Sequence, residues 1–268
     1  MTTDRTEQHI QLARDVLLMA PAGLVTDLDG TLSRIVDEPA AAQPIAEVSE
    51  LLRDLARRLA VVAVITGRSA ADARRMLGPI GRDLLIVGNH GLEWLAPGSE
   101  APEAAVRAEG LRADLQAALA AVPPADGVAI DDKGLSATVH YRAAPDPEAA
   151  RQTLLAALRI LPLGLELREG RRSVELRPAG MGDKGSAVAR IAQEHALRGL
   201  LVTGDDVTDI DMFVAADALR AQGLATLTLA VAGGAEVSRA VSDAADVTVP
   251  SPEALVRVLR GVAESFGG

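Results

Sequence analysis

Short, continuous apolar runs alternate along this chain with longer stretches in which apolar residues recur every three or four positions. Fully apolar runs are typical of strands buried on both faces, and the longer period is typical of amphipathic helices. The alternation predicts a parallel sheet covered by helices on both faces. The predicted strands are Gly23–Leu28, Val61–Ile65, Leu84–Val87, Leu200–Thr203, Ala225–Ala230 and Asp246–Val249. The predicted helices are Ile45–Leu59, Ser69–Leu77, Lys184–Ala196, Asp209–Leu219 and Pro252–Glu264.

The middle of the chain follows a different order of helix, two strands, helix and two strands. This order describes a small α+β unit that interrupts the larger pattern. We therefore predict an α/β core made of residues 1–93 and 179–268, and an inserted domain of residues 94–178. The elements predicted for the insert are helices Pro102–Ala121 and Asp146–Leu158 and strands Val128–Asp131, Leu135–His140, Leu163–Arg168 and Ser173–Arg177.

The amino-acid composition limits which binding partners and which cellular compartment we expect for this protein. The formal net charge is −10, and a nucleic-acid partner would need a basic surface. With no cysteine, disulfides, thiolate metal sites and cysteine nucleophiles are excluded. No apolar stretch is long enough to span a membrane, and the first twenty residues mix charged with apolar positions, unlike a signal peptide. We expect a cytoplasmic protein with no membrane and no nucleic-acid partner.

The candidate chemistry begins where the first predicted strand ends. Asp27 and Asp29 are two residues apart, so in an extended segment their side chains point to the same side. Gly30 follows at once and allows a sharp turn and a close approach to a bound group. Two carboxylates placed in this way can bind a divalent cation, and one of them can attack phosphorus while the other transfers protons. An acidic turn after a buried strand is the alternative for this segment alone.

Further polar residues follow other predicted strands. Thr66-Gly67-Arg68 comes after the second strand, and Asn89 comes after the third. Asp183-Lys184-Gly185 opens a helix, where Lys184 would contribute a positive charge, although an N-capping Asp with a solvated Lys explains the same residues. After the strand that ends at Thr203, three carboxylates occur within five residues, an arrangement that is unfavourable without a cation. These three are Asp205, Asp206 and Asp209.

Taken together and in this order, the four segments resemble the motifs of the haloacid-dehalogenase-like (HAD) phosphotransferase superfamily. Asp27-Leu28-Asp29-Gly30-Thr31 is the most specific of them. The resemblance covers about residues 20–93 and 179–265. It implies a Rossmann-like doubly wound parallel sheet core with an inserted α+β cap domain (αββαββ), inserted after the third strand, where the sequence pattern had already placed the extra unit.

A narrower resemblance is to the trehalose-6-phosphate phosphatases. Gly88-Asn89-His90-Gly91-Leu92-Glu93 is similar to the Gly-x-His-Gly-x-Glu of that family. In the insert, Asp132 to Ser136, His140-Tyr141-Arg142, Glu169-Gly170 and Glu175 to Pro178 are also similar to its motifs. Two departures are visible: Ile210 follows Asp209 where an acid is usual, and Asp131 stands where Glu is common. The second departure puts one sugar contact in doubt.

The resemblance implies roles for individual residues. Asp27 would be the nucleophile and Asp29 the general acid and base, with Thr66 and Lys184 orienting the phosphoryl oxygens. Mg²⁺ would be held by Asp27, by the backbone carbonyl of Asp29 and by Asp205. Asp206 and Asp209 would orient the metal site or Lys184. The residues implied to bind the sugar are Arg68, Asn89, His90 and Gly91 in the core and Lys133, His140, Arg142 and Glu169 in the cap.

The expected activity is Mg²⁺-dependent hydrolysis of trehalose 6-phosphate, a small sugar phosphate, through an aspartyl-phosphate. We expect a monomer that is functionally coupled to trehalose-6-phosphate synthase. Alternative hypotheses are a capped phosphatase for sucrose 6-phosphate or mannosyl-3-phosphoglycerate, a phosphohexomutase, or a sugar-binding module without chemistry. A non-catalytic regulatory subunit of a trehalose-phosphate synthase is a further alternative. The non-catalytic hypotheses are disfavoured because the chain has the full set of expected catalytic residues, which a binding protein would not need. This set is Asp27, Asp29, Thr66, Lys184 and Asp205.

Overall fold

The computed structural model describes residues 2–36, 41–104, 110–170, 172–180, 182–232 and 239–266. The chain divides into two compact units, one of Met1–Pro102 with Gly182–Gly268 and one of Glu103–Met181. The sequence predicted the boundaries at 93/94 and 178/179, which are nine residues earlier at the first boundary and three residues earlier at the second. The first boundary lies later because the chain continues into a strand that pairs with the third strand of the large sheet.

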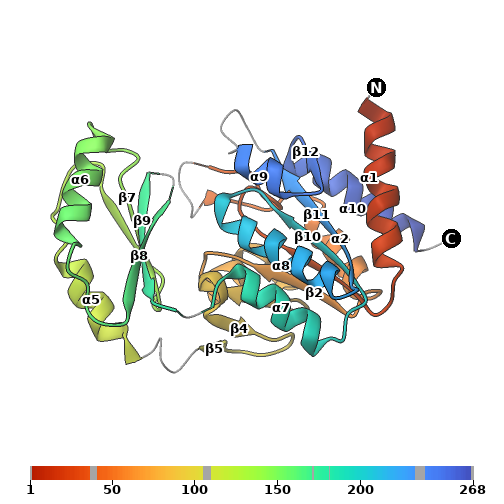
Figure 1. Ribbon diagram of the computed structural model, residues 1–268, viewed down its shortest axis with the longest axis horizontal. Coiled ribbons are helices and arrows are strands. Elements are labelled where there is room, and N and C mark those ends of the chain that lie inside the picture. Colours follow the sequence, from red (N-terminus) through yellow and green to blue (C-terminus); the bar gives the residue numbers. More distant parts are fainter. Residues whose placement is uncertain are drawn as a thin grey trace. The chain divides into compact units, whose positions relative to one another are not determined.

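The first unit is built on a mostly parallel sheet with the strand order β12-β11-β10-β1-β2-β3-β4-β5 (Figure 1). β1 pairs in parallel with both β2 and β10, and β4 is antiparallel to its neighbour β3. The strands are β1 (Ala22–Thr26), β2 (Val61–Ile65), β3 (Leu85–Gly88), β4 (Glu93–Leu95), β10 (Gly199–Gly204), β11 (Ala225–Val231) and β12 (Val247–Val249), and the last strand of the order, β5 (Glu103–Ala104), consists of residues assigned to the second unit. The predicted doubly wound α/β class is confirmed, whereas β4 and β5 were not predicted.

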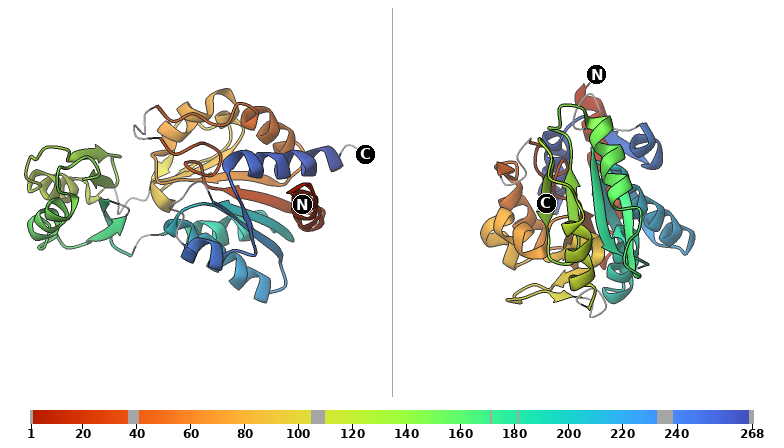
Figure 2. Two further views of the ribbon diagram at one scale, coloured as in Figure 1. Left: turned by 90° about the horizontal axis from the view of Figure 1, so that it is seen from above. Right: turned by 90° about the vertical axis from the view of Figure 1, so that its left-hand side faces the viewer.

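Helices cover both faces of this sheet (Figure 2). Because successive strand side chains alternate, Leu24 belongs to the core on one face and Val25 to the core on the other. The helices on the Leu24 face are α1 (Thr2–Leu17), α2 (Val48–Ala56), α3 (Ala70–Leu77) and α10 (Pro252–Ser265). Those on the Val25 face are α7 (Lys184–Glu194), α8 (Ile210–Ala221) and α9 (Arg239–Ala244). Short 3₁₀ helices within the described residues include η2 (Gly78–Arg82), η3 (Asn89–Gly91) and η4 (Val207–Asp209).

The second unit has the predicted αββαββ order. Its four strands form an antiparallel sheet in the order β6-β7-β9-β8, and both helices pack on one face of it. The elements are α5 (Arg112–Ala120), β6 (Ala129–Asp132), β7 (Ala137–His140), α6 (Pro147–Ala157), β8 (Leu165–Gly170) and β9 (Ser173–Pro178).

The helix predicted over Pro102–Ala121 is corrected by the structure. It begins only at Arg112, and Glu103–Ala104 are a strand, while residues 105–109 lie outside the described residues. The Ala-rich composition raised the helix propensity of the whole stretch, but Glu103–Ala104 are extended and a turn at Leu111 precedes the helix that starts at Arg112, so the weak preference is overridden. Within the described residues, no helix combines the length and the apolar character needed to cross a membrane.

The junction between α1 and the sheet yields a stability prediction. A Cβ atom at Gly199, the first residue of β10, would lie 2.0 Å from the carbonyl oxygen of Val16 and 3.1 Å from that of Met19. Because both neighbours are backbone atoms, Gly199→Ala should displace the end of α1 and lower the free energy of unfolding by about 2 kcal/mol. Urea denaturation measures this change.

The matched control is Gly110→Ala, since a Cβ there would meet no atom of the described residues within 4 Å. Its free energy of unfolding should change by less than about 0.5 kcal/mol. Equal unfolding midpoints for the wild type and Gly199→Ala would contradict the close packing of α1 on β10.

Candidate active site

The candidate site lies where the direction of winding reverses in the sheet. β1 and β10 are neighbours, and the chain winds outward from them in opposite directions. Ligands of open α/β sheets bind at such a switch point, beyond the carboxyl ends of the strands. Asp27 directly follows β1 and Asp205 directly follows β10. The backbone N–H of Asp27 donates to the carbonyl of Thr203 at 2.9 Å, so the two strand ends are joined up to the site.

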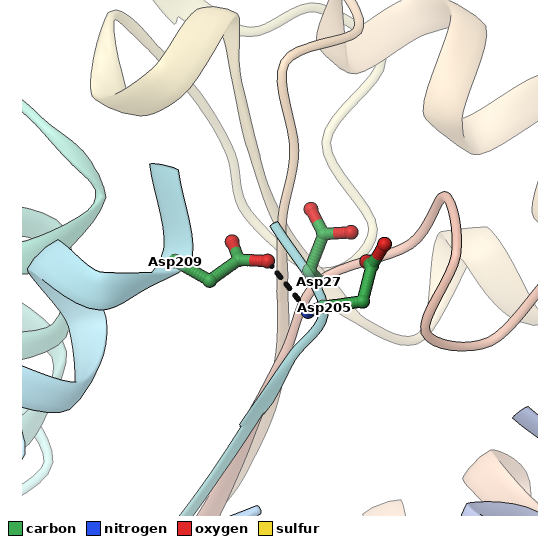
Figure 3. Close-up of side chains that lie close together, drawn as sticks. All are labelled: Asp27, Asp205 and Asp209. Atoms are coloured by element: carbon green, nitrogen blue, oxygen red, sulfur yellow. Dashed lines mark hydrogen bonds between the residues drawn. The ribbon is translucent and has the colours of Figure 1, made fainter. Parts of the chain in front are cut away.

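Three buried carboxylates meet at this switch point (Figure 3). Asp27, Asp205 and Asp209 each offer an oxygen atom, and these oxygens lie within 4.8 Å of one another. Asp27 is 5% exposed, Asp205 is 6% exposed and Asp209 is fully buried. The hydroxyl of Thr31 donates to Asp205 Oδ1 at 2.9 Å and fixes the orientation of that carboxylate.

Lys184 supplies the positive charge of this cluster. It is the first residue of α7, which is capped by the Asp183 side chain, and it is 3% exposed. Its Nζ donates to Asp27 Oδ1 and to Asp209 Oδ1, each at 2.6 Å. Burial lowers the pKa of Lys184, but the nearby charges of Asp209 and Asp27 outweigh this effect, and the pKa is raised. Lys184 is therefore a buried ammonium ion that joins two carboxylates.

The charges in the cluster do not balance. Burial first, and then the negative charge of Asp209, raises the pKa of Asp27 to about 8, although Lys184 opposes the shift. Burial and the charges of Asp27 and Asp209 raise the pKa of Asp205 to about 9. When all three carboxylates are ionised, Lys184 neutralises only one of them, and a divalent cation would neutralise the other two. An all-oxygen donor set suits a hard cation such as Mg²⁺.

Asp209 differs from the other two carboxylates because both of its oxygens are engaged. Oδ1 accepts from Lys184, and Oδ2 accepts from the backbone N–H groups of Asp205 at 2.8 Å and Asp206 at 3.0 Å. Asp209 therefore holds Lys184 and the end of β10 in place. The side chain of Asp206 is exposed and caps η4, outside the carboxylate cluster.

Gly30 allows the two acidic loops to approach. Its φ of +86° lies in the left-handed region, which strains residues that carry a side chain. A Cβ at this position would also lie 2.0 Å from Asp205 Oδ2. No larger residue fits between the loops that follow β1 and β10.

Asp29 and Arg68 form a bidentate ion pair beside the cluster. Arg68 Nε donates to Asp29 Oδ2 at 2.6 Å, and Nη2 donates to Oδ1 at 2.7 Å. The side chain of Asp29 is 37% exposed and that of Arg68 is 17% exposed. Arg68 was predicted to bind the sugar, and in this structure it engages both oxygens of the predicted general acid.

Thr66 and the turn η3 complete the site in the first unit. Thr66 is buried, and its hydroxyl oxygen accepts from the backbone N–H of Arg68 at 3.2 Å, so the hydroxyl can donate its proton to a ligand. Asn89 and His90 have φ values of +49° and +55°, a conformation that costs residues with side chains about 1–3 kcal/mol each. A Cβ at Gly67 would lie 2.6 Å from His90 Nε2, so His90 lies directly over Gly67.

The four predicted sugar ligands of the second unit do not form one group. The pKa of His140 is lowered by burial and by the positive charges of Lys133 and Arg142, so these three lie near one another. Glu169 instead accepts from Arg151 Nε of α6 at 2.6 Å. The strand register pairs Glu169 with Val174 and His140 with Ser173, which puts Glu169 and His140 on opposite faces of the sheet.

Sequence analysis assigned no role to several residues that the structure makes prominent. Thr31 orients Asp205. It is the last residue of the motif that starts at Asp27, so its place in that motif could have marked it as a site residue. Glu93 is buried and accepts from the N–H of Ala70 at 2.5 Å. In the second unit, Glu175 is paired in register with Thr138 and Arg168, on the sheet face away from α5 and α6. Polar residues alternate along β9 at Ser173, Glu175 and Arg177, and this alternation in the sequence could have indicated that they share one face of the sheet.

Comparisons with known proteins agree on one family. The family model described as Trehalose-phosphatase matches residues 25–248. A probable trehalose-phosphate phosphatase of Sinorhizobium fredii is 32% identical over 247 residues, which cover 90% of this chain and 87% of that protein. The C-terminal domain of Candida albicans trehalose-6-phosphate phosphatase has a TM-score of 0.78 at 20% identity and covers 96% of this chain and 97% of that one. At this identity the structural likeness shows the fold alone.

Another relative is much longer than this chain. An uncharacterized glycosyl hydrolase of Mycobacterium tuberculosis is 38% identical over 234 residues, which cover 82% of this chain. The chain spans only 17% of the length of that protein.

The raised pKa values of Asp27 and Asp205 predict how stability depends on pH without metal. Both groups have an ordinary pKa of 3.8, and both keep their protons to a higher pH in the folded protein. Their contribution to stability is therefore fully present below pH 3.8 and is lost as the pH rises through the folded values of about 8 and about 9. In EDTA, the melting temperature should fall across this range.

Added Mg²⁺ should reverse this fall, because it replaces the protons. Differential scanning fluorimetry should show a melting-temperature increase of about 5 °C at pH 8.5, and a smaller one at pH 5.5. Asp205→Asn should remove most of the increase, whereas Asp206→Asn should keep it. An equal effect of Mg²⁺ at both pH values would contradict binding at this carboxylate cluster.

Proposed function

Because the chain belongs to the trehalose-phosphatase family, we propose that it hydrolyses trehalose 6-phosphate to trehalose and inorganic phosphate. The observation that carries the proposal is the buried cluster in which Lys184 joins Asp27 to Asp209 beside Asp205. A protein that only binds a sugar has no need of four buried charged groups at a strand end. Such clusters are costly in the folded state unless they act on a charged ligand.

Asp27 is the proposed nucleophile. One of its carboxylate oxygens attacks phosphorus in line with the sugar oxygen, forming an acyl-phosphate while the bond from phosphorus to the sugar oxygen breaks. Water then attacks the phosphorus of this intermediate, releasing phosphate and restoring the Asp27 carboxylate. Lys184 and the Thr66 hydroxyl are positioned to donate hydrogen bonds to phosphoryl oxygens, where negative charge is concentrated in both steps.

Asp27, Asp205 and the backbone carbonyl of Asp29 would hold Mg²⁺. When bound, this cation neutralises the carboxylates and draws electron density from the phosphoryl group. Asp209 is better suited to holding Lys184 than to binding the cation, because both of its oxygens already accept hydrogen bonds. This difference in hydrogen bonding supports Asp27 and Asp205 as the cation ligands. It supports Asp209 as the residue that holds Lys184 in position beside them.

Asp29 is the proposed acid and base. It would protonate the departing sugar oxygen and then take a proton from the attacking water. Both of its oxygens accept from Arg68, each with one of its two lone pairs, so the ion pair fixes the orientation in which Asp29 would give or take a proton. A sugar phosphate that offers its own oxygens to Arg68 would open the pair, which links the predicted sugar contact of Arg68 to the proton transfer by Asp29.

We propose that η3 of the first unit contacts the sugar and, separately, that the second unit carries further sugar-binding residues. Lys133, His140 and Arg142 remain candidates there. Glu169 pairs with Arg151 on the other face of the sheet. Glu175 lies on the same face as His140 and therefore replaces Glu169 as the candidate carboxylate for sugar binding. We keep functional coupling to a trehalose-6-phosphate synthase and a monomeric state as part of the proposal.

The central test measures phosphate release by the purified protein from trehalose 6-phosphate, sucrose 6-phosphate, glucose 6-phosphate and p-nitrophenyl phosphate. Release should be fastest from trehalose 6-phosphate, should stop in EDTA and should return with Mg²⁺. Asp27→Asn should lower kcat by at least about 10³-fold, because an amide is a poor nucleophile. Equal rates on all sugars would remove the trehalose assignment, and no release from any ester would favour a regulatory protein.

The role of Asp29 has a separate test, based on the leaving group. A sugar alkoxide needs a proton as it departs, whereas p-nitrophenolate leaves without one. Asp29→Asn should therefore lower the rate of the first chemical step on trehalose 6-phosphate by about 10²–10⁴-fold, and on p-nitrophenyl phosphate far less. Single-turnover kinetics isolate this step, with Asp206→Asn as the control. Equal losses on both esters would contradict proton donation by Asp29.

A further inference from the structure

The turn η3 lies between the starts of two helices that serve the site. The N–H of Asn89 donates to the carbonyl of Arg68 at 2.7 Å, and the N–H of His90 donates to the carbonyl of Thr66 at 3.0 Å. On the other side, a Cβ at Gly91 would lie 3.0 Å from the carbonyl oxygen of Asp183, the residue that caps α7. The turn therefore contacts the segments that carry Thr66, Arg68 and Lys184.

The conformation of η3 is not one that the backbone of Asn89 and His90 favours by itself. Asn89 and His90 are both in the left-handed region, and Gly91 also has a positive φ of +117°. Three consecutive residues of this kind persist only where surrounding contacts impose them. The two hydrogen bonds to the loop after β2 exist only while the turn keeps this conformation, so whatever holds the turn also sets the position of His90 over Gly67.

Glu93 provides such contacts. It is 8% exposed, and its Oε2 accepts from the N–H of Ala70, the first residue of α3, at 2.5 Å. The side chain of Asn89 donates a second hydrogen bond to the same carboxylate. A carboxylate at a helix N-terminus is also favoured by the helix dipole. Glu93 thus joins the strained turn to the helix that follows Arg68.

Trp94 holds the other end of the turn. Its ring N–H donates to the carbonyl of Gly91 at 3.0 Å, and the guanidinium of Arg190, from α7, lies 3.8 Å from the centre of its ring. The first two residues of β4 therefore fix both ends of η3, one toward α3 and the other toward α7.

We propose that Glu93 is a positioning residue that sets how the enzyme binds the sugar of its substrate, by holding the Asn89–Gly91 turn against the Thr66–Arg68 loop. In this proposal Glu93 does not touch the substrate itself. It acts through its hydrogen bonds with Asn89 and with Ala70 at the start of α3. This inference rests on the function proposed above, in which the turn contacts the sugar while Asp27, Lys184 and Asp205 act on the phosphoryl group. Loosening the turn should then impair sugar binding more than phosphoryl transfer.

Glu93→Gln tests this separation. The glutamine keeps the shape and one accepting oxygen, but its amide nitrogen cannot accept the second hydrogen bond. KM for trehalose 6-phosphate should rise about tenfold, the effect of one hydrogen bond lost, with kcat changed by less than about threefold. With p-nitrophenyl phosphate, which has no sugar, kcat/KM should change by less than about threefold.

Asp246→Asn is the matched control. Asp246 also accepts from a backbone N–H and from side chains, those of Thr228 and Arg220, but it precedes β12, which lies at the opposite end of the strand order from β4 and β5. It should lower the melting temperature about as much as Glu93→Gln does and leave both KM values within about twofold.

Two results would overturn the role of Glu93. One is an unchanged KM for the sugar phosphate, and the other is an equal loss on both esters that follows the melting temperature, as a purely structural residue would give. Failure of the proposed function looks different, because the wild-type protein would then not prefer trehalose 6-phosphate. If it prefers another sugar phosphate, the same comparison on that ester tests Glu93.

Discussion

The buried ion pairs of Lys184 are the interaction on which the site depends. One ammonium group bonds the carboxylate that follows β1 and the carboxylate that begins α8, and it is itself carried by the first residue of α7. Removing the charge of Lys184 would leave two buried carboxylates without their cation, which is far more costly than losing an exposed ion pair. Three segments far apart in the sequence are held in one arrangement as a result.

The sheet explains why these charges can be brought together at all. Parallel strands end on the same edge, and at the switch point between β1 and β10 the two following loops diverge and leave space beyond the strand ends. The backbone around this space is adapted to close approach. Gly30 has no side chain to collide with Asp205, and the left-handed residues of η3 direct their N–H groups to the loop after β2.

In the proposed function, catalysis and sugar recognition are divided between parts of the chain with different constraints. The carboxylate cluster in the first unit is buried and is held by hydrogen bonds from Lys184 and Thr31, so it suits a single invariant group, the phosphoryl group of the proposed substrate. The second unit presents charged and hydroxyl side chains on a sheet face that its helices do not cover. The turn η3 belongs to the first unit but is held by residues of β4, outside the acidic motifs, which allows sugar binding to change without altering Asp27 or Lys184.

The sequence by itself determined the fold class, the αββαββ order of the insert and the residues that gather at the switch point. It could do so because apolar periodicity specifies buried faces, and because parallel strands bring the residues that follow them to one edge. It missed β4 and β5, which are too short to show a period, and it placed a helix over Glu103–Ala104 from composition alone. Only the tertiary structure decided that Asp209 holds Lys184, that Arg68 pairs with Asp29 and that Glu169 and His140 lie on opposite faces. These facts depend on strand register and on contacts between distant segments, which no local pattern of residues contains.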